Sequence, residues 1–119
     1  MPDSTGTGQP LTGVRVIDFT QVMLGPCCTQ ILGDFGADVI KIEKPRSGDL
    51  SRWSVAGEGA NNPVFQSLNR NKRSLALDLR GETGKAIVRD LVMKADVVVS
   101  NFRPRSEEHT SELQSRFGI

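Results

Sequence analysis

Three basic residues placed just after apolar segments are the best candidates for chemistry in this sequence. Lys44 and Arg46 follow one such segment, and Arg80 follows another. Both residue types bind phosphate groups, arginine through a planar fork and lysine as a point charge. The turn 23–26, Met-Leu-Gly-Pro, leads into a predicted helix, and the free amide groups at a helix start attract anions. These features predict binding of a phosphorylated small molecule, with an ordinary solvated basic surface as the alternative.

The elements that must position these residues are predicted from apolar periodicity. Strands are predicted at 14–19, 37–42, 75–79 and 96–99, helices at 26–35 and 83–95, a loop at 44–64 and a helical turn at 65–68. This order is typical of an α/β fold with a parallel sheet and flanking helices. Ligands of such sheets bind at the carboxyl ends of the strands. Lys44 and Arg80 should therefore share one edge, whereas Lys72 and Arg73, which precede the third predicted strand, should lie at the opposite edge.

Each of the two longer predicted helices presents an apolar face toward the sheet. The faces consist of Cys28, Ile31, Leu32 and Phe35 in the first helix and Ile87, Val88, Leu91 and Val92 in the second. Pro26 suits the first position of its helix because its missing N–H is not needed there. Gly36 suits a left-handed C-cap.

The composition of the 119 residues excludes several functions. A net charge of +1 gives no indication of nucleic acid or an anionic membrane as a partner. No apolar stretch of about 18 residues predicts a transmembrane helix, and residues 1–9 are predicted to be a flexible tail rather than a signal peptide. The adjacent Cys27 and Cys28 cannot complete a zinc site, so no metal is expected. They are interpreted as small apolar residues, with a reactive thiol as the alternative, and both interpretations suit a reducing cytoplasm.

Four acidic residues lie near predicted strand ends or in the predicted loop 44–64. Asp18 ends the first strand, where a catalytic role is conceivable, but a turn or capping hydrogen bond is the favoured interpretation. Asp38 and Asp96 begin strands and are interpreted as structural. Asp49 follows Gly48 and is interpreted as a turn or cap residue.

The segment Arg105–Ile119 differs from the rest because it is polar and aperiodic. It resembles the in-frame translation of a sequencing-library adapter. We therefore interpret 105–119 as a non-native tail, with an ordinary solvated tail as the alternative, and expect 10–104 to be the folded part. His109 lies in this segment and is assigned no chemistry.

Six motifs follow one another between Pro10 and Pro104. They read Pro-Leu-Thr-Gly-Val-Arg-Val-Ile-Asp (10–18), Gly-Pro (25–26), Gly-Ala-Asp-Val-Ile-Lys-Ile-Glu (36–43), Gly-Asp (48–49), Asn-Arg-Asn-Lys-Arg-Ser (69–74) and Asn-Phe-Arg-Pro (101–104). Their order resembles the family III CoA transferases, which include formyl-CoA:oxalate and carnitine CoA transferases and α-methylacyl-CoA racemases. The sequence is similar to an amino-terminal fragment of the large Rossmann-like domain of that family.

The resemblance implies an enzyme that moves CoA from an acyl-CoA to a carboxylic acid through a covalent aspartyl intermediate. It implies acyl-CoA and a carboxylate acceptor as partners and an interlocked homodimer at full length. The nucleophilic aspartate lies beyond Pro104 in the family, so no catalytic residue is expected here, and the chain alone is expected to be inactive. The alternatives are a racemase-like enzyme, a CoA-binding module without catalysis, and a truncated chain that only aggregates.

By position, the resemblance also implies which residues contact CoA. They are Met23 and Leu24, Lys44, Leu77, Asp78, Leu79 and Arg80, and Asn101, Phe102 and Arg103. Two of them depart from the family pattern. Met23 stands where formyl-CoA transferases carry a glutamine that bonds the acyl group, which argues against formyl and oxalate as substrates. Lys44 stands where the family often has arginine and keeps the charge without the planar fork.

Overall fold

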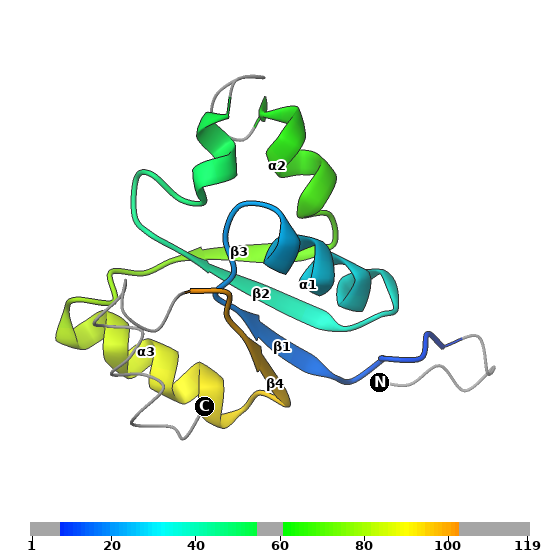
Figure 1. Cartoon of the computed structure of the whole chain (residues 1–119). Coiled ribbons are helices and arrows are strands. Elements are labelled where there is room, and N and C mark those ends of the chain that lie inside the picture. The colour runs from blue at the N-terminus through cyan, green and yellow to red at the C-terminus, as the bar shows by residue number, and fades with distance from the viewer. Residues whose placement is uncertain (1–7, 55–60, 103–119) are drawn as a thin grey trace.

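The computed structural model describes residues 8–54 and 61–102. Their elements are β1 (Arg15–Asp18), α1 (Leu24–Asp34), β2 (Asp38–Glu43), η1 (Leu50–Trp53), α2 (Pro63–Leu68), β3 (Lys72–Ala76), α3 (Glu82–Met93) and β4 (Val97–Val99). The strands form one sheet in the order β3-β2-β1-β4, and every pairing is parallel (Figure 1). The chain steps outward from β1 to β3 and then returns to β4 on the other side of β1. The predicted α/β fold with a parallel sheet is therefore confirmed.

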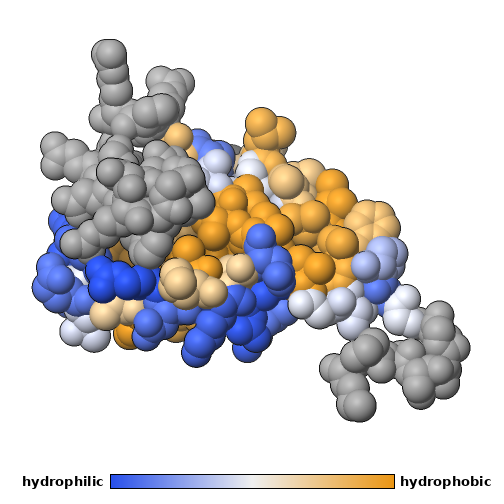
Figure 2. All heavy atoms as spheres, turned by 90° about the horizontal axis from the view of Figure 1, so that it is seen from below, coloured by the Kyte–Doolittle hydropathy of each residue, from blue (hydrophilic) through white to orange (hydrophobic). Residues whose placement is uncertain are grey.

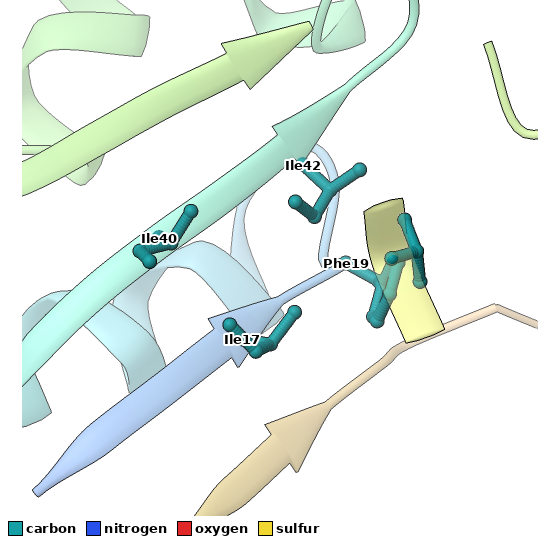
Figure 3. Packing of buried hydrophobic residues seen from close by; sticks show 5 residues of the cluster. Ile17, Phe19, Ile40 and Ile42 are labelled. Atoms are coloured by element: carbon teal, nitrogen blue, oxygen red, sulfur yellow. The ribbon is translucent and has the colours of Figure 1, made fainter. Parts of the chain in front are cut away.

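The face of the sheet under α3 is a continuous apolar core. Ile17 and Phe19 from β1 and its exit lie beside Ile40 and Ile42 from β2, as Figure 3 shows. Val88 of α3 packs against them and is fully buried. The predicted apolar face of this helix is largely correct, because Leu91 and Val92 also join the cluster, whereas Ile87 is 40% exposed.

The opposite face, under α1, is apolar only near the amino ends of the strands. Val16, Ala37 and Val39 form a second cluster there, with Leu32 of α1 packed against it. Toward the carboxyl ends the same face buries the charged residues Asp18, Lys41 and Glu43.

The predicted apolar face of α1 is wrong in three of its four residues. Cys28 is exposed, and Ile31 and Phe35 are 47% and 51% exposed. The buried residues of this helix are the small or polar Gly25, Pro26, Thr29, Gln30 and Gly33. A side chain at Gly33 would lie 3.4 Å from Asn71 and 3.6 Å from Val39, so the helix approaches the sheet more closely than large side chains would allow.

The third strand begins and ends earlier than predicted. It runs over Lys72–Ala76 and not 75–79, with Val39 opposite Lys72 and Glu43 opposite Ala76. Lys72 and Arg73 are therefore inside the strand rather than ahead of it. Leu77 donates one more backbone hydrogen bond, to the Glu43 carbonyl at 3.0 Å, before the chain turns. Residues 77–80 consequently form the loop at the carboxyl edge of the sheet.

The ends of the first helix also differ in part from the prediction. The helix begins at Leu24 instead of Pro26. Gly36 has a φ of +102° and takes the predicted left-handed conformation after its end. Of the predicted tail 1–9, residues 8 and 9 are described, and Gln9 donates to the Asp34 carbonyl at 3.3 Å. The predicted non-native tail 105–119 lies outside the described residues.

None of the helices in the described ranges has the length and apolarity that crossing a bilayer requires. Within the same ranges, no three His, Cys, Asp or Glu residues are grouped so that they would hold a metal ion.

Candidate functional site

A cavity of about 400 Å³ opens at the carboxyl edge of β1, β2 and β3. It is lined by Phe19, Gln21, Ile42, Glu43, Lys44, Pro45, Arg46, Ser47, Leu77, Asp78, Leu79, Arg80 and Phe102. These residues come from the end of β2 and from the segments that follow the four strands. The position agrees with the rule that parallel sheets bind ligands beyond the carboxyl ends of their strands.

The cavity brings together six of the ten predicted site residues. They are Lys44, Leu77, Asp78, Leu79, Arg80 and Phe102. The side chains of Lys44, Arg46 and Arg80 are exposed and supply three positive charges around an opening whose inner wall includes Phe19 and Ile42. Such a lining can hold an anionic group at the rim and an apolar group further in.

The loop after β3 is fixed by its own backbone and side-chain contacts. The Asp78 carboxylate accepts the Arg80 amide at 3.0 Å, and the Asp78 carbonyl accepts the Gly81 amide at 3.3 Å. Gly84, in the first turns of α3, lies against this loop so closely that a Cβ would stand 2.0 Å from the Asp78 carbonyl oxygen. The loop therefore has little freedom to move Arg80 away from the cavity.

Asn101 joins the loop after β1 to the end of β4 instead of lining the cavity. Its side-chain oxygen accepts the Gln21 amide at 3.0 Å, and its amide group donates to the Gln21 carbonyl at 2.9 Å. A Cβ at Gly25 would lie 3.0 Å from Asn101 and 2.5 Å from Thr20. Glycine is thus required where the β1 loop, the start of α1 and β4 meet.

Met23 and Leu24 lie at the start of α1, outside the cavity lining. Met23 is 59% exposed and Leu24 is 84% exposed. The helix start has no side-chain cap and no acidic residue in its first turn. Arg103, the tenth predicted residue, lies outside the described residues.

Asp18 is a buried structural acid, as the turn interpretation predicted. Its carboxylate accepts hydrogen bonds from Thr20 and from the Thr29 hydroxyl and lies 3.0 Å from the Lys72 ammonium. Burial lowers the pKa of Lys72, and the Asp18 charge opposes that effect. Both carboxylate oxygens of Asp18 are held by these groups, and the residue has no exposed surface. Asp18 is therefore not placed to attack a substrate.

Two further buried acids link the loops around the site. Asp49 caps η1 by accepting the Ser51 amide, and its carboxylate lies 2.7 Å from the Lys41 ammonium. Glu43 accepts two hydrogen bonds from Arg52, each 2.9 Å, and one from the Asp49 amide. Burial alone would raise the pKa of both carboxyls, but these partners outweigh it and lower both pKa values.

Sequence reasoning missed Lys41, Glu43 and Lys72 as members of this network. A signal was present, because Val39, Lys41 and Glu43 alternate along β2 and therefore share one face of the sheet. The prediction of this strand rested on its apolar residues and assigned no role to Lys41 or Glu43.

The sequence model described as "CoA-transferase family III" matches residues 11–111. The chain belongs to CoA-transferase family III. The family model therefore covers the six motifs, which lie between Pro10 and Pro104, except for Pro10. The match runs past Pro104, and the boundary of the native sequence there stays a prediction.

Among its relatives, this CoA-transferase family III chain is 48% identical over 95 residues to a formyl-CoA:oxalate CoA-transferase of Bradyrhizobium diazoefficiens. It is 44% identical over 107 residues to an acyl-CoA transferase of Fusarium pseudograminearum. These alignments cover 79% and 82% of the chain but only 22% and 24% of the relatives. The chain therefore spans less than a quarter of the length of these relatives.

Solved structures of the family have the same fold. A CaiB/BaiF family protein from Brucella suis superposes with a TM-score of 0.75 at 36% sequence identity. The superposition covers 94% of this chain and 29% of the other protein. The described sheet and helices thus correspond to part of a larger family structure.

Proposed function

We propose that this chain supplies the CoA-binding part of an enzyme that moves CoA from an acyl-CoA to a carboxylic acid. Membership of CoA-transferase family III supports the reaction class. The observation that carries the proposal is the grouping of Lys44, Arg46 and Arg80 around one cavity at the carboxyl edge of the sheet. CoA is a phosphorylated nucleotide with a long, largely uncharged arm, and the cavity offers cations at its rim and apolar side chains beyond.

In the proposed complex, different residues hold different parts of CoA. Lys44 and Arg80 bind phosphate oxygens, while Phe102 lies along the pantetheine arm. Asn101 acts mainly through the β1 loop that it holds, and that loop leads to Met23 and Leu24 near the acyl end. Arg103 is retained as a proposed contact.

The covalent chemistry is proposed to use an aspartate outside 10–104. An aspartate carboxylate attacks the thioester carbonyl, the carbon–sulfur bond breaks, and a mixed anhydride and the CoA thiolate form. Attack of the thiolate on the aspartyl carbonyl then releases the first carboxylic acid and leaves CoA on the enzyme as a thioester. The acceptor carboxylate attacks the aspartyl thioester, displaces the CoA thiolate and forms a second mixed anhydride. The thiolate then attacks the acceptor carbonyl of this anhydride, which gives the acceptor CoA thioester and restores the aspartate carboxylate.

The acyl group is proposed to be other than formyl. Met23 is 59% exposed and has no hydrogen-bond donor in its side chain, so it cannot orient a small polar acyl group as an amide would. A thioether instead suits contact with an apolar acyl chain.

A homodimer in the cytoplasm completes the proposal. Figure 2 shows apolar side chains gathered on the face seen from below. Met93, the last residue of α3, and Val97, the first residue of β4, are 75% and 39% exposed. Surfaces of this kind are commonly covered by further protein. The free thiols of Cys27 and Cys28 suit a reducing compartment.

The test is a calorimetric titration of CoA into the chain and into four variants. Lys44→Ala and Arg80→Ala are each expected to weaken binding by about three- to tenfold, which is roughly 0.7–1.4 kcal/mol. Lys94→Ala and Arg89→Ala remove exposed cations that do not line the cavity and should leave the affinity unchanged. Equal affinity in all four variants would contradict the proposed site, provided that circular dichroism shows the same folded state.

A further inference from the structure

Val22 has an unusual backbone conformation in the loop between β1 and α1. Its φ is +72°, a left-handed value that is a genuine outlier for a β-branched residue. Such strain persists only where the surroundings hold it, and it is concentrated at functional sites. The residue directly precedes Met23, so its conformation decides how the chain enters α1.

A buried carboxylate 27 residues away holds this conformation. One Asp49 oxygen accepts the Val22 amide at 3.0 Å, and the other lies 2.7 Å from the Lys41 ammonium. The side chains of Lys41 and Asp49 are 1% and 0% exposed. Lys41 also donates to the Thr20 carbonyl at 2.8 Å. The ion pair therefore contacts the loop at Thr20 and at Val22, on either side of Gln21.

Capping of η1 does not explain this arrangement by itself. Asp49 accepts the amide and hydroxyl of Ser51 through the same oxygen that binds Val22. An exposed serine or asparagine would cap a helix of four residues equally well. Burial of an ion pair is costly and seldom adds net stability, which points to a role in fixing one conformation.

We propose that Asp49 is a positioning residue that holds Val22 in its left-handed conformation and thereby sets where Met23 stands beside the CoA site. The positioning itself depends only on contacts between β1, β2 and their loops. Its consequence for CoA rests on the proposed function. Because the partners of Asp49 lower its pKa, the carboxylate is charged at neutral pH and accepts the Val22 amide fully.

The experiment combines a structural readout with a binding readout on the 119-residue chain. In NMR spectra, a strong intraresidue NOE between the amide and α protons reports the positive φ of Val22. Asp49→Ala, which removes both carboxylate oxygens, should lose this NOE and weaken CoA binding by about tenfold. Asp96→Ala is the matched control, because Asp96 also accepts a backbone amide, that of Arg15 at 2.9 Å, but at the other edge of the sheet.

Glycine at position 22 separates positioning from a merely structural role. Glycine adopts a positive φ without strain, so the double variant Val22→Gly/Asp49→Ala should regain most of the CoA affinity that Asp49→Ala loses. If Asp49→Ala does not fold, Val22→Gly alone decides: relief of backbone strain should raise Tm, and a lower Tm would overturn the proposal.

The outcomes distinguish this proposal from the proposed function. Retention of the Val22 NOE in Asp49→Ala overturns the positioning role, as does loss of the NOE with unchanged CoA affinity. A wild-type chain that binds no CoA refutes the proposed function, and the NOE in Asp49→Ala then decides the positioning role alone.

Discussion

The face of the sheet under α3 is apolar except for exposed charges at its amino edge, whereas the face under α1 buries its charges near the carboxyl edge. Ile17, Phe19, Ile40 and Ile42 fill the first face. Asp18 and Lys41 occupy positions on the second face that leucine or valine could fill. The buried charges lie at the end of the sheet that carries the candidate site.

This difference separates two tasks of the same strands. Apolar burial is non-directional, so the α3 face contributes stability without holding a loop in one conformation. Hydrogen bonds and ion pairs are directional, and those of Asp49 and Asn101 hold the loops after β1 and β2 in one arrangement. Four substitutions or changes of condition test this division, beginning with the largest expected effect.

Adjacent residues of β3 give the sharpest test, because they point to opposite faces. The Lys72 side chain is 2% exposed beside Asp18, and that of Arg73 is 65% exposed beside Asp38. Lys72→Met leaves Asp18 buried without its counter-charge and should reduce the free energy of unfolding by about 3–5 kcal/mol. Arg73→Met should cost less than about 1 kcal/mol. Urea unfolding measures both, and equal losses would contradict the distinction between the faces.

Val88→Ala tests the apolar face. Val88 is fully buried against the cluster around Ile17, and removal of its two methyl groups should cost about 2 kcal/mol through lost burial and the remaining cavity. Ile87→Ala, one position earlier in α3 and 40% exposed, serves as the control and should cost less. CoA affinity should not change in either variant, and a loss of affinity in Val88→Ala would show that the two tasks are not separate.

The comparison of faces also explains which features could be predicted from sequence. The α3 face follows the ordinary rule that apolar residues recur on the buried side, and Val88, Leu91 and Val92 were correctly predicted. The α1 face inverts that rule, because close approach of helix and sheet selects Thr29 and Gly33 for the contact. Periodicity therefore predicted burial for side chains that are exposed.

The site shows the same limit. Lys44 and Arg80 could be predicted at one edge, because the order of strands and loops decides that edge. The left-handed Val22 and its bond to Asp49 could not, because they depend on a contact across 27 residues. The bounds of the third strand were also mispredicted, since Leu75, Leu77 and Leu79 all join the same core although only Leu75 lies in the strand.

Acid should selectively reduce the contribution of the α1 face to the free energy of unfolding. Partners lower the pKa of Glu43 from its usual 4.5 and that of Asp49 from its usual 3.8, against the opposing effect of burial. The unfolded chain therefore binds more protons in acid, and this contribution to stability, complete above about pH 5, is lost as pH falls through the lowered values. Urea unfolding between pH 6 and about pH 3 measures the slope. Glu43→Gln should make the slope shallower, and an unchanged slope would refute the assignment.

Added salt should produce the smallest effect and should act on one face only. Raising NaCl from about 0.1 M to about 1 M shortens the Debye length from roughly 10 Å to roughly 3 Å. The exposed Arg73–Asp38 pair, at 2.7 Å, is open to that screening, so the cost of Arg73→Met should fall by a few tenths of a kcal/mol. The Lys72–Asp18 pair is closed to solvent, so the cost of Lys72→Met should stay the same. Because each cost is a difference between wild type and variant at one salt concentration, the general effect of salt on folding cancels. A salt-dependent cost at Lys72 would mean that water and ions reach the buried pair, and the charged face would then be a solvated surface instead of a fixed support for the loops.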